Sequence, residues 1–362
     1  HSEALFENGV KDGVYLFDQT EASIEFTGVT EKPVASLLRN FSAPVNLEFN
    51  YSDEELAFLL QYETNGFNQW QATQTLLERI LLNGHDAQIY VDAIKQTLPN
   101  VIEKDPLLAS RLFDVPSEGY LGSRIDQDYN PLIVNEAREA LLNQLAKVLG
   151  DFVKETYLSL DPDSQNEFSQ AMGVRALKNI MLSFMARQGD TAVFDLAYAQ
   201  YENSVNMSER LGALKVLVWN DAPQAKAALA DFYKRFKDEA LSLDQWFMIQ
   251  AAHPKATAET IQYLTSHTDY DLGTPNRIRS VSGGLNANPV NAWSFGVQHF
   301  VDLAKYLDEK NPIVGSRLLQ VLTRWYTLAE PQRSEVKAAL EGLKSQVKSK
   351  NVSETLNSML SV

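Results

Sequence analysis

The spacing of apolar residues changes once along this 362-residue chain, and that change constrains the fold more than any other feature. Up to Tyr51 apolar side chains recur at every second position, and from Ser52 onward they recur at every third or fourth position. A period of two is typical of strands with one buried face, and a period of 3.6 is typical of helices. We therefore predict a β segment over residues 1–51 and a helical domain over residues 52–362.

The β pattern occupies three short stretches, at residues 14–17, 22–27 and 45–51. In the third stretch Val45, Leu47, Phe49 and Tyr51 alternate with polar residues. Three short strands are marginal as an independent sheet. We therefore interpret residues 1–51 as the remnant of a β-domain, or as a sheet that another segment completes.

The helical part begins with a strong start signal and contains regular breaks. Ser52 followed by Glu55 has the form of a capping box. Five later breaks place a capping side chain directly before a proline, which suits the N-cap and first position of a helix: Asp105, Asn130, Asp161, Asn288 and Asn311. About fourteen to sixteen helices fit this spacing. The predicted fold is mainly α, an irregular superhelical array of the HEAT or armadillo kind.

Composition excludes several classes of function. The chain has no cysteine, which excludes disulfides, a thiol nucleophile, a Cys-ligated zinc and an iron–sulfur centre, and it fits a reducing compartment such as the cytoplasm. The net charge of −15 argues against a nucleic-acid partner. No apolar run approaches the roughly 20 residues that span a bilayer, so we expect no membrane partner.

No catalytic motif is present in the sequence. The five histidines, at positions 1, 85, 253, 267 and 299, never occur four residues apart, so the helix that carries two zinc-binding histidines is missing. Nucleophile-elbow, P-loop and dinucleotide-binding motifs are also missing, and we interpret Gly283-Gly284 as a helix end. We therefore predict no catalytic residue and no metal ligand in this chain.

Two pairs of arginines stand apart from the apolar pattern. Arg277 and Arg279 are two positions apart and must lie on different sides of a helix. One interpretation is a capped helix with one arginine in a structural ion pair. The other is an arginine that faces a concave interior, where its guanidinium could meet a peptide carboxylate or carbonyl. Arg317 and Arg324 are seven apart, which would place them on one face of the next helix.

Several stretches resemble bacterial-type aminopeptidase N, a family of zinc aminopeptidases of the gluzincin group. The resemblance covers nearly the whole chain, and it is carried by five segments in the same order: residues 33–45, 51–56, 65–72, 275–280 and 311–318. The family has four domains, and this chain is similar to the last strands of the third, a β-sandwich, together with the helical fourth.

The resemblance implies that hydrolysis takes place elsewhere in a longer protein. The zinc ligands and the catalytic glutamate belong to the family's catalytic domain, so this segment is expected to hold no cofactor and to be inactive alone. It implies that the helical domain closes over the catalytic domain of the same chain and shapes the access of peptide substrates. It further implies that Arg279 and Arg317 line the substrate cavity.

A second interpretation belongs to a different class of protein. A free-standing α-solenoid could bind peptides or a protein partner on its concave face. The two interpretations differ in what precedes His1 in the reading frame. A zinc-binding helix motif upstream would favour the aminopeptidase, and a start codon near residue 1 would favour the scaffold.

Overall fold

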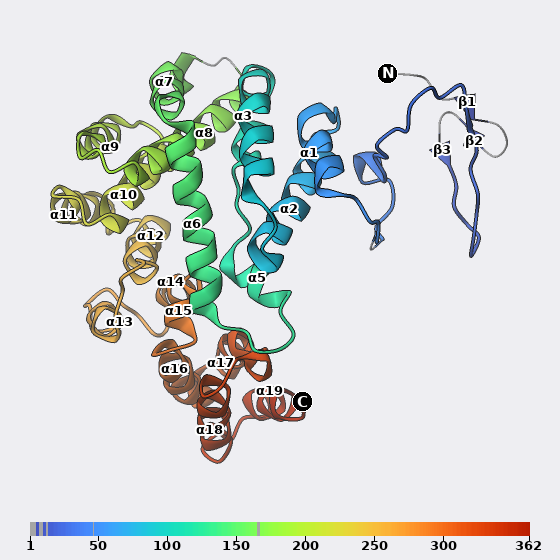
Figure 1. The fold of residues 1–362 in the computed structure, drawn as a ribbon. Coiled ribbons are helices and arrows are strands. Elements are labelled where there is room, and N and C mark those ends of the chain that lie inside the picture. The colour runs from blue at the N-terminus through green and yellow to red at the C-terminus, as the bar shows by residue number, and fades with distance from the viewer. Residues whose placement is uncertain (1–4, 7–9, 12–13, 46, 165–166) are drawn as a thin grey trace.

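The computed structural model describes residues 5–6, 10–11, 14–45, 47–164 and 167–362. Its helices form a curved array, and the strands lie in an extended amino-terminal segment at one side of that array (Figure 1). The predicted fold class, a mainly α superhelical array after a small β segment, is confirmed.

Four short strands form two antiparallel pairs in this amino-terminal segment. They are β1 (Leu5–Phe6), β2 (Val10–Lys11), β3 (Val14–Tyr15) and β4 (Phe26–Thr27). β1 pairs with β4, and β2 pairs with β3. The first two predicted stretches thus contribute residues to strands, although each strand is only two residues long.

The third predicted strand, at residues 45–51, is wrong. This stretch has no regular secondary structure over its described residues, and its backbone hydrogen bonds are local, from Val45 N to Ala43 O and from Tyr51 N to Phe49 O. Alternation creates a two-faced extended segment, but a strand also needs a neighbouring strand to accept and donate its hydrogen bonds. No such neighbour lies among the described residues.

The structure describes nineteen α-helices in the part of the chain outside its gaps, and they follow one another with short connections. The first eight are α1 (Asp53–Tyr62), α2 (Gly66–Asn83), α3 (Ala87–Lys104), α4 (Pro106–Leu112), α5 (Glu118–Ser123), α6 (Pro131–Leu149), α7 (Asp151–Ser159) and α8 (Phe168–Arg187). The next six are α9 (Ala192–Asn203), α10 (Met207–Trp219), α11 (Ala225–Phe236), α12 (Ala240–Ala251), α13 (Ala258–Thr265) and α14 (Pro275–Asn286).

The last five helices form the carboxy-terminal end of the array. They are α15 (Pro289–Ala292), α16 (Gly296–Lys310), α17 (Pro312–Leu319), α18 (Gln332–Lys344) and α19 (Lys350–Leu360). Four 3₁₀ turns accompany the helices, namely η1 (Arg39–Phe41), η2 (Pro162–Ser164), η3 (Gln320–Leu322) and η4 (Trp325–Thr327). The expected fourteen to sixteen helices were too few because α4, α5 and α15 are too short to show an apolar period.

The predicted start signals coincide with the amino-terminal ends of helices. The Ser52 side chain accepts a hydrogen bond from Glu55 N, and Glu55 Oε2 accepts one from Ser52 N at 2.9 Å, which completes the capping box. Four of the five residues before prolines are N-caps whose side chains accept a backbone N–H: Asp105, Asn130, Asn288 and Asn311. The fifth, Asp161, precedes the 3₁₀ turn η2 instead of an α-helix.

Gly283 and Gly284 do not end a helix, contrary to the expectation. α14 continues through both glycines and ends at Asn286. A Cβ at position 284 would lie 2.8 Å from Ala251 Cβ and 2.8 Å from Met248 O, both on α12. Gly284 therefore allows α12 and α14 to pack in close contact, and this packing explains a glycine in a helix interior.

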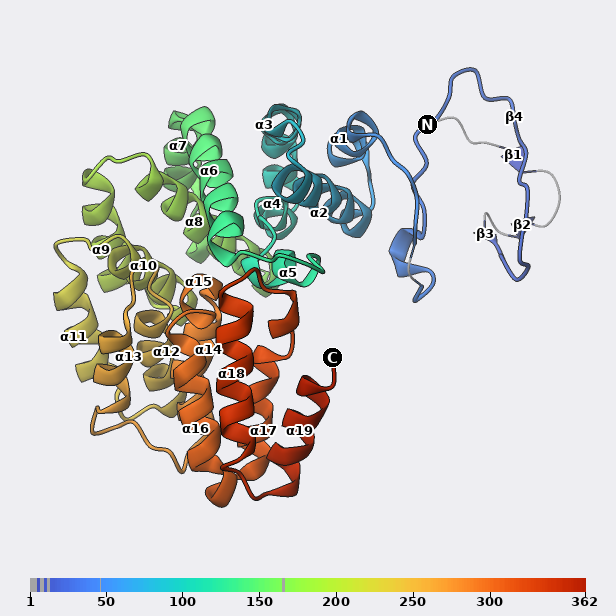
Figure 2. The ribbon, with the colours of Figure 1, turned by 60° about the horizontal axis from the view of Figure 1, so that its bottom comes forward.

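The carboxy-terminal part of the array also meets the loop between α5 and α6, which lies much earlier in the sequence (Figure 2). Tyr129 N donates to Thr327 O at 2.8 Å, and Ala329 N donates to Tyr129 O at 2.9 Å. Arg324 Nη2 donates to Ile125 O at 2.9 Å across almost 200 positions of sequence. One buried apolar cluster extends from Leu56 of α1 to Met359 of α19.

A separate small apolar cluster joins α14, α16 and α17. It consists of Ile278, Leu303, Leu307 and Leu318. This cluster holds α14 and α17 at a fixed spacing, which matters for the site described below. Within the described ranges, no helix combines the length and the apolar character that a membrane span requires.

Candidate functional site

The two arginines of α14 lie in opposite environments. Arg277 is only 6% exposed; its Nε donates to Asp244 Oδ1 at 2.6 Å and its Nη1 donates to Asp269 O at 2.9 Å. Its guanidinium also lies 5.1 Å from the centre of the Phe247 ring. Arg277 is therefore a structural residue that ties α14 to α12 and to the loop before α14.

Arg279 is exposed and lies beside a pocket of about 470 Å³ between α14 and α17. Arg317 of α17 lines the same pocket. The two arginines come from segments almost 40 positions apart, and the packing of both helices on α16 brings them to one opening. The structure thus brings together at one pocket the two arginines that the family resemblance selected.

The other lining residues divide into a polar and an apolar group. The polar ones are Ser282, Asn286 and Asn311. The apolar ones, which also include a proline and a glycine, are Pro275, Gly283, Ile313, Val314, Leu318 and Val321. On α14 the lining positions follow Pro275 at intervals of four, seven, eight and eleven, which is one face of a helix.

The pocket carries positive charge that acidic side chains do not neutralise. Over the described parts of the chain, neither Arg279 nor Arg317 has a carboxylate within ion-pair distance. Arg279 Nη2 donates to Asn276 Oδ1 at 2.6 Å, which is a neutral acceptor on the same helix. The two guanidinium groups give this opening a local positive charge in a chain of net charge −15.

A histidine lies behind the pocket wall. Ser282 Oγ and His299 Nε2 are 3.4 Å apart, which links α14 to α16. Burial lowers the pKa of His299 from its ordinary value of 6.5 to about 4, so the imidazole is neutral at pH 7. The two guanidinium groups are therefore the cations of the pocket at that pH.

Arg324 does not share a helix face with Arg317, contrary to the expectation. α17 ends at Leu319, and the chain then continues through η3, so the seven-residue spacing no longer falls on one helix. Arg324 instead contacts Ile125 O and Asp126 Oδ1, where it helps to close the array. The sequence pattern could not show this break because Val321 and Leu322 continue the apolar period.

The histidines that the structure describes are dispersed, while His1 lies outside the described residues. His85 contacts Asp53, and His267 packs among the rings of Tyr233, Trp246 and Phe247. Among the described residues, no three His, Cys, Asp or Glu side chains gather in a way that could hold a metal ion. These residues therefore do not fit a zinc ligand set.

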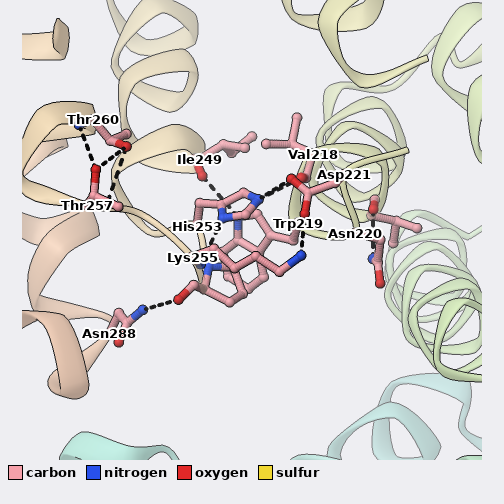
Figure 3. Close-up of polar contacts among 12 residues, drawn as sticks. Val218, Trp219, Asn220, Asp221, Ile249, His253, Lys255, Thr257, Thr260 and Asn288 are labelled. Atoms are coloured by element: carbon pink, nitrogen blue, oxygen red, sulfur yellow. Dashed lines mark hydrogen bonds and ion pairs between the residues drawn. The ribbon is translucent and has the colours of Figure 1, made fainter. Parts of the chain in front are cut away.

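His253 belongs to a polar network between the ends of α10 and α12 (Figure 3). Its Nδ1 accepts from Lys255 N at 2.9 Å, so in the neutral ring Nε2 carries the proton and donates to Val218 O at 2.9 Å. Asp221 Oδ2 lies 2.5 Å from Lys255 Nζ, and this hydrogen bond holds the pKa of Asp221 below its usual range. Because both ring nitrogens are occupied, His253 is a structural residue.

A second pocket, of about 340 Å³, lies between the amino-terminal segment and the first two helices. Its walls are mostly apolar and come from residues 36–51, α1 and α2, with Phe41, Phe49 and Phe67 among them. Sequence reasoning missed this pocket because it assigned residues 45–51 to a strand. It also missed Ser282 and Asn286, although their helical spacing from Arg279 could have indicated a shared face.

Comparison with known proteins supports the resemblance that the sequence motifs suggested. Residues 53–361 match the family described as "Domain of unknown function (DUF3458_C) ARM repeats", and residues 3–50 match the family described as "Domain of unknown function (DUF3458) Ig-like fold". Aminopeptidase N of Escherichia coli is 33% identical over 90% of this chain, and aminopeptidase N of Haemophilus influenzae is 29% identical over 88%.

A solved structure agrees with these sequence relatives. The crystal structure of Legionella pneumophila aminopeptidase A in complex with aspartic acid superimposes with a TM-score of 0.79 at 25% identity, over 92% of this chain and 41% of that one. The chain spans about two fifths of the length of the curated relatives, 39% for the Escherichia coli protein and 38% for the Haemophilus influenzae protein. The similarity to the carboxy-terminal part of bacterial aminopeptidase N is thus confirmed, and the chain belongs to the DUF3458_C family of helical, ARM-repeat domains.

Proposed function

We propose that this chain is the carboxy-terminal part of a zinc aminopeptidase that removes amino-terminal residues from peptides. In this proposal the helical array covers the catalytic domain of the same polypeptide and shapes the access of peptides to it. The observation that carries the proposal is the match to Escherichia coli aminopeptidase N, 33% identical over 90% of this chain. The β segment and the helical array would then be neighbouring parts of one larger protein.

The side chains of this chain support a role in peptide binding, with hydrolysis in another part of the complete protein. A zinc aminopeptidase needs a metal with an open coordination position and a general base beside it. No such cluster exists among the described residues. When bound, the zinc ion would polarise the first peptide carbonyl. Its ligands would come from a part of the complete protein that this chain does not include. Binding and steering of the peptide are what this chain can supply.

Arg279 and Arg317 are our candidates for that steering. Their guanidinium groups line one pocket, and no carboxylate of the described residues lies within ion-pair distance of either one. They can therefore donate to peptide carbonyls or to a carboxylate. Contacts of this kind act on the distal part of a substrate. They can therefore distinguish long peptides from single amino-acyl compounds.

The proposed setting is the cytoplasm, with neither nucleic acid nor membrane as a partner. The absence of cysteine fits a reducing compartment. The charge of −15 disfavours binding to polyanions. The proposed partners are the catalytic domain of the same chain and peptide substrates.

Expression of the complete reading frame that contains this chain tests the proposal. We expect the purified complete protein to contain stoichiometric zinc and to release the first residue of short peptides and of amino-acyl anilides. Removal of zinc with a chelator should abolish the release, and added zinc should restore it. A complete protein with no aminopeptidase activity, or a reading frame that begins near residue 1, would favour the α-solenoid scaffold instead.

A further inference from the structure

We propose that Asn83 is a site of spontaneous deamidation, at which the backbone nitrogen of Gly84 closes a succinimide on the Asn83 side chain, and that the product loosens the contact of α2 with α1. The site lies at the carboxy-terminal end of α2, outside the pocket between α14 and α17. Its chemistry does not depend on the proposed function, and it can be tested with this chain alone.

An asparagine followed by glycine can modify itself in water without an enzyme. The following backbone nitrogen attacks the side-chain carbonyl carbon, and a carbon–nitrogen bond forms. The side-chain NH₂ group and the backbone N–H proton leave together as ammonia. Water then opens the five-membered ring at either carbonyl and gives aspartate or isoaspartate. Glycine favours the first step because it has no side chain that obstructs the approach of its nitrogen.

The sequence contains three Asn-Gly pairs, which begin at positions 8, 65 and 83. The first pair lies outside the described residues. The other two stand at opposite ends of α2, with Asn65 as the N-cap and Asn83 as the last residue of the helix. The same dipeptide therefore occurs in two structural settings on one helix, and Asn65 serves as an internal comparison for Asn83.

The side chain of Asn65 is held by hydrogen bonds at both of its polar atoms. Its Oδ1 accepts from Asn68 N at 3.1 Å, and its Nδ2 donates to Asn40 Oδ1 at 2.6 Å. The following glycine is also enclosed, since a Cβ at Gly66 would lie 3.1 Å from Leu108 Cδ2. Rotation of the Asn65 amide toward Gly66 N breaks both hydrogen bonds, so ring closure is slow at this pair.

The side chain of Asn83 has none of these restraints. Asn83 is exposed, as are Gly84 and His85 after it, and over the described parts of the chain no hydrogen bond involves the Asn83 side chain. A Cβ at Gly84 would meet no atom within 4 Å, so the space beside the attacking nitrogen is open. The Asn83 amide can therefore rotate toward Gly84 N without the loss of a contact.

One backbone hydrogen bond opposes the reaction at Asn83. Gly84 N donates to Arg79 O, so the last turn of α2 must open before the nitrogen can attack. Helix ends open at a lower free-energy cost than helix interiors. Since Asn65 must break two side-chain hydrogen bonds, we expect deamidation at Asn83 to be roughly tenfold faster than at Asn65 in the folded chain.

The product would weaken the connection between the end of α2 and the start of α1. His85 Nδ1 lies 2.5 Å from Asp53 Oδ2, and Arg79 Nη1 donates to Asp53 Oδ1 at 2.9 Å. A carboxylate at position 83, one helical turn after Arg79, would compete with Asp53 for the guanidinium. It would also lie in the last turn of α2, where the helix dipole disfavours negative charge. Isoaspartate would in addition lengthen the main chain by one carbon atom before Gly84.

Incubation of the folded 362-residue chain in mildly alkaline buffer tests the proposal, with peptide mapping by mass spectrometry as the readout. The buffer is prepared with water that carries heavy oxygen. The deamidated peptide should contain one heavy oxygen atom and should occur as a mixture of isoaspartate and aspartate, which is the signature of a succinimide. The rate at Asn83 should exceed the rate at Asn65 in the folded chain, and the two rates should become similar in urea.

Two variants separate the sites. N83Q should abolish the reaction at position 83, because glutamine would have to close a six-membered ring, which forms far more slowly. N40G removes the acceptor of Asn65 Nδ2 and suits the left-handed φ of +57° at position 40, so it should raise the rate at Asn65 and leave the rate at Asn83 unchanged. Each variant is first compared with the wild type by circular dichroism.

The deamidated wild-type chain, separated by ion exchange, should melt about 1–2 °C below the unmodified chain. Three results would overturn the proposal: a rate at Asn65 equal to or above that at Asn83 in the folded chain, aspartate without isoaspartate at position 83, or equal melting temperatures of the two forms. All three measurements use the wild-type chain, so they remain decisive even if a variant fails to fold.

Discussion

At the scale of single residues, two arginines two positions apart on α14 have different roles because a helix turns them to different sides. Arg277 points into the core and meets Asp244 and Phe247, while Arg279 stays exposed beside the pocket. The guanidinium chemistry is the same in both, and burial decides the role. A charge that is buried needs a partner, and a charge that remains exposed without one is available to a ligand.

Substitution of Arg279 or Arg317 by alanine in the complete protein should affect long and short substrates differently. The kcat/KM for peptides of several residues should fall roughly threefold to tenfold, which corresponds to the loss of one largely exposed ion pair. Hydrolysis of a single amino-acyl anilide, which cannot reach the pocket, should barely change. Equal losses for both substrates together with a lower melting temperature would instead make the arginines structural.

The partly buried imidazole of His299 makes stability depend on pH between about 4 and 6.5. Its pKa is about 4 in the folded chain and ordinarily 6.5, so in this window the unfolded chain takes up a proton that the folded chain does not. The free energy of unfolding should therefore fall as the pH decreases from 6.5 to 4, by about 2–3 kcal/mol from this group.

Urea unfolding at several pH values, compared between the wild type and H299Q, measures this contribution. Glutamine keeps a polar group near Ser282 but does not titrate, so the variant should lose less stability over the same window. Parallel pH curves for the two proteins would contradict a lowered pKa of the imidazole at position 299.

At the scale of elements, glycine positions show how closely the helices pack. Gly283 and Gly284 are neighbours on α14, but they face different surroundings. A Cβ at Gly283 would meet no atom within 4 Å, whereas a Cβ at Gly284 would lie 2.8 Å from Ala251 Cβ and from Met248 O of α12. The contact between α12 and α14 therefore requires glycine at position 284 only.

Alanine at each glycine should shift stability in opposite directions. G284A should destabilise the protein by about 1–3 kcal/mol, because α12 must move away from α14. G283A should stabilise it by about 0.5–1 kcal/mol, because alanine has the higher helix propensity. Chemical denaturation of both variants measures the two changes in the free energy of unfolding. Equal effects at the two positions would show that helix propensity, not packing, governs this contact.

At the scale of the whole molecule, the sequence predicted the helical array and four α-helix N-caps before prolines, because these features depend on local pattern. The apolar period of α2 or α16 and the cap of Asn311 involve residues within a few positions of each other. The helical spacing also correctly placed Arg277 and Arg279 on different sides of α14. Local pattern failed where partners are distant in sequence.

Three features that depend on residues far apart in sequence illustrate this limit. Residues 45–51 alternate like a strand but have no described partner, so they form none. Arg324 lies outside the helix of Arg317, which ends at Leu319, and it binds Ile125 O, almost 200 positions earlier. The shared pocket of Arg279 and Arg317 depends on the packing of α14 and α17 on α16, which no local pattern encodes. The resemblance to a family, not the spacing of residues, selected those two arginines.

The domain boundary at Tyr51–Ser52 remains a prediction. Residues 52–362 contain their own capping box and nearly all of the large buried cluster, so they should unfold cooperatively after deletion of residues 1–51. In the longer chain, amides of residues 14–45 should exchange with solvent faster than those of the helices. A molten helical state after the deletion would show that the amino-terminal segment belongs to the same folding unit.

The most direct test of the central claim is turnover by this 362-residue chain alone, measured with an amino-acyl anilide while zinc is titrated and its binding is followed by calorimetry. The proposed function assigns peptide steering to this chain and hydrolysis to another part of a longer protein. It predicts no stoichiometric zinc binding and no product release at any zinc concentration. Binding of one zinc ion per chain together with measurable, chelator-sensitive turnover would contradict it.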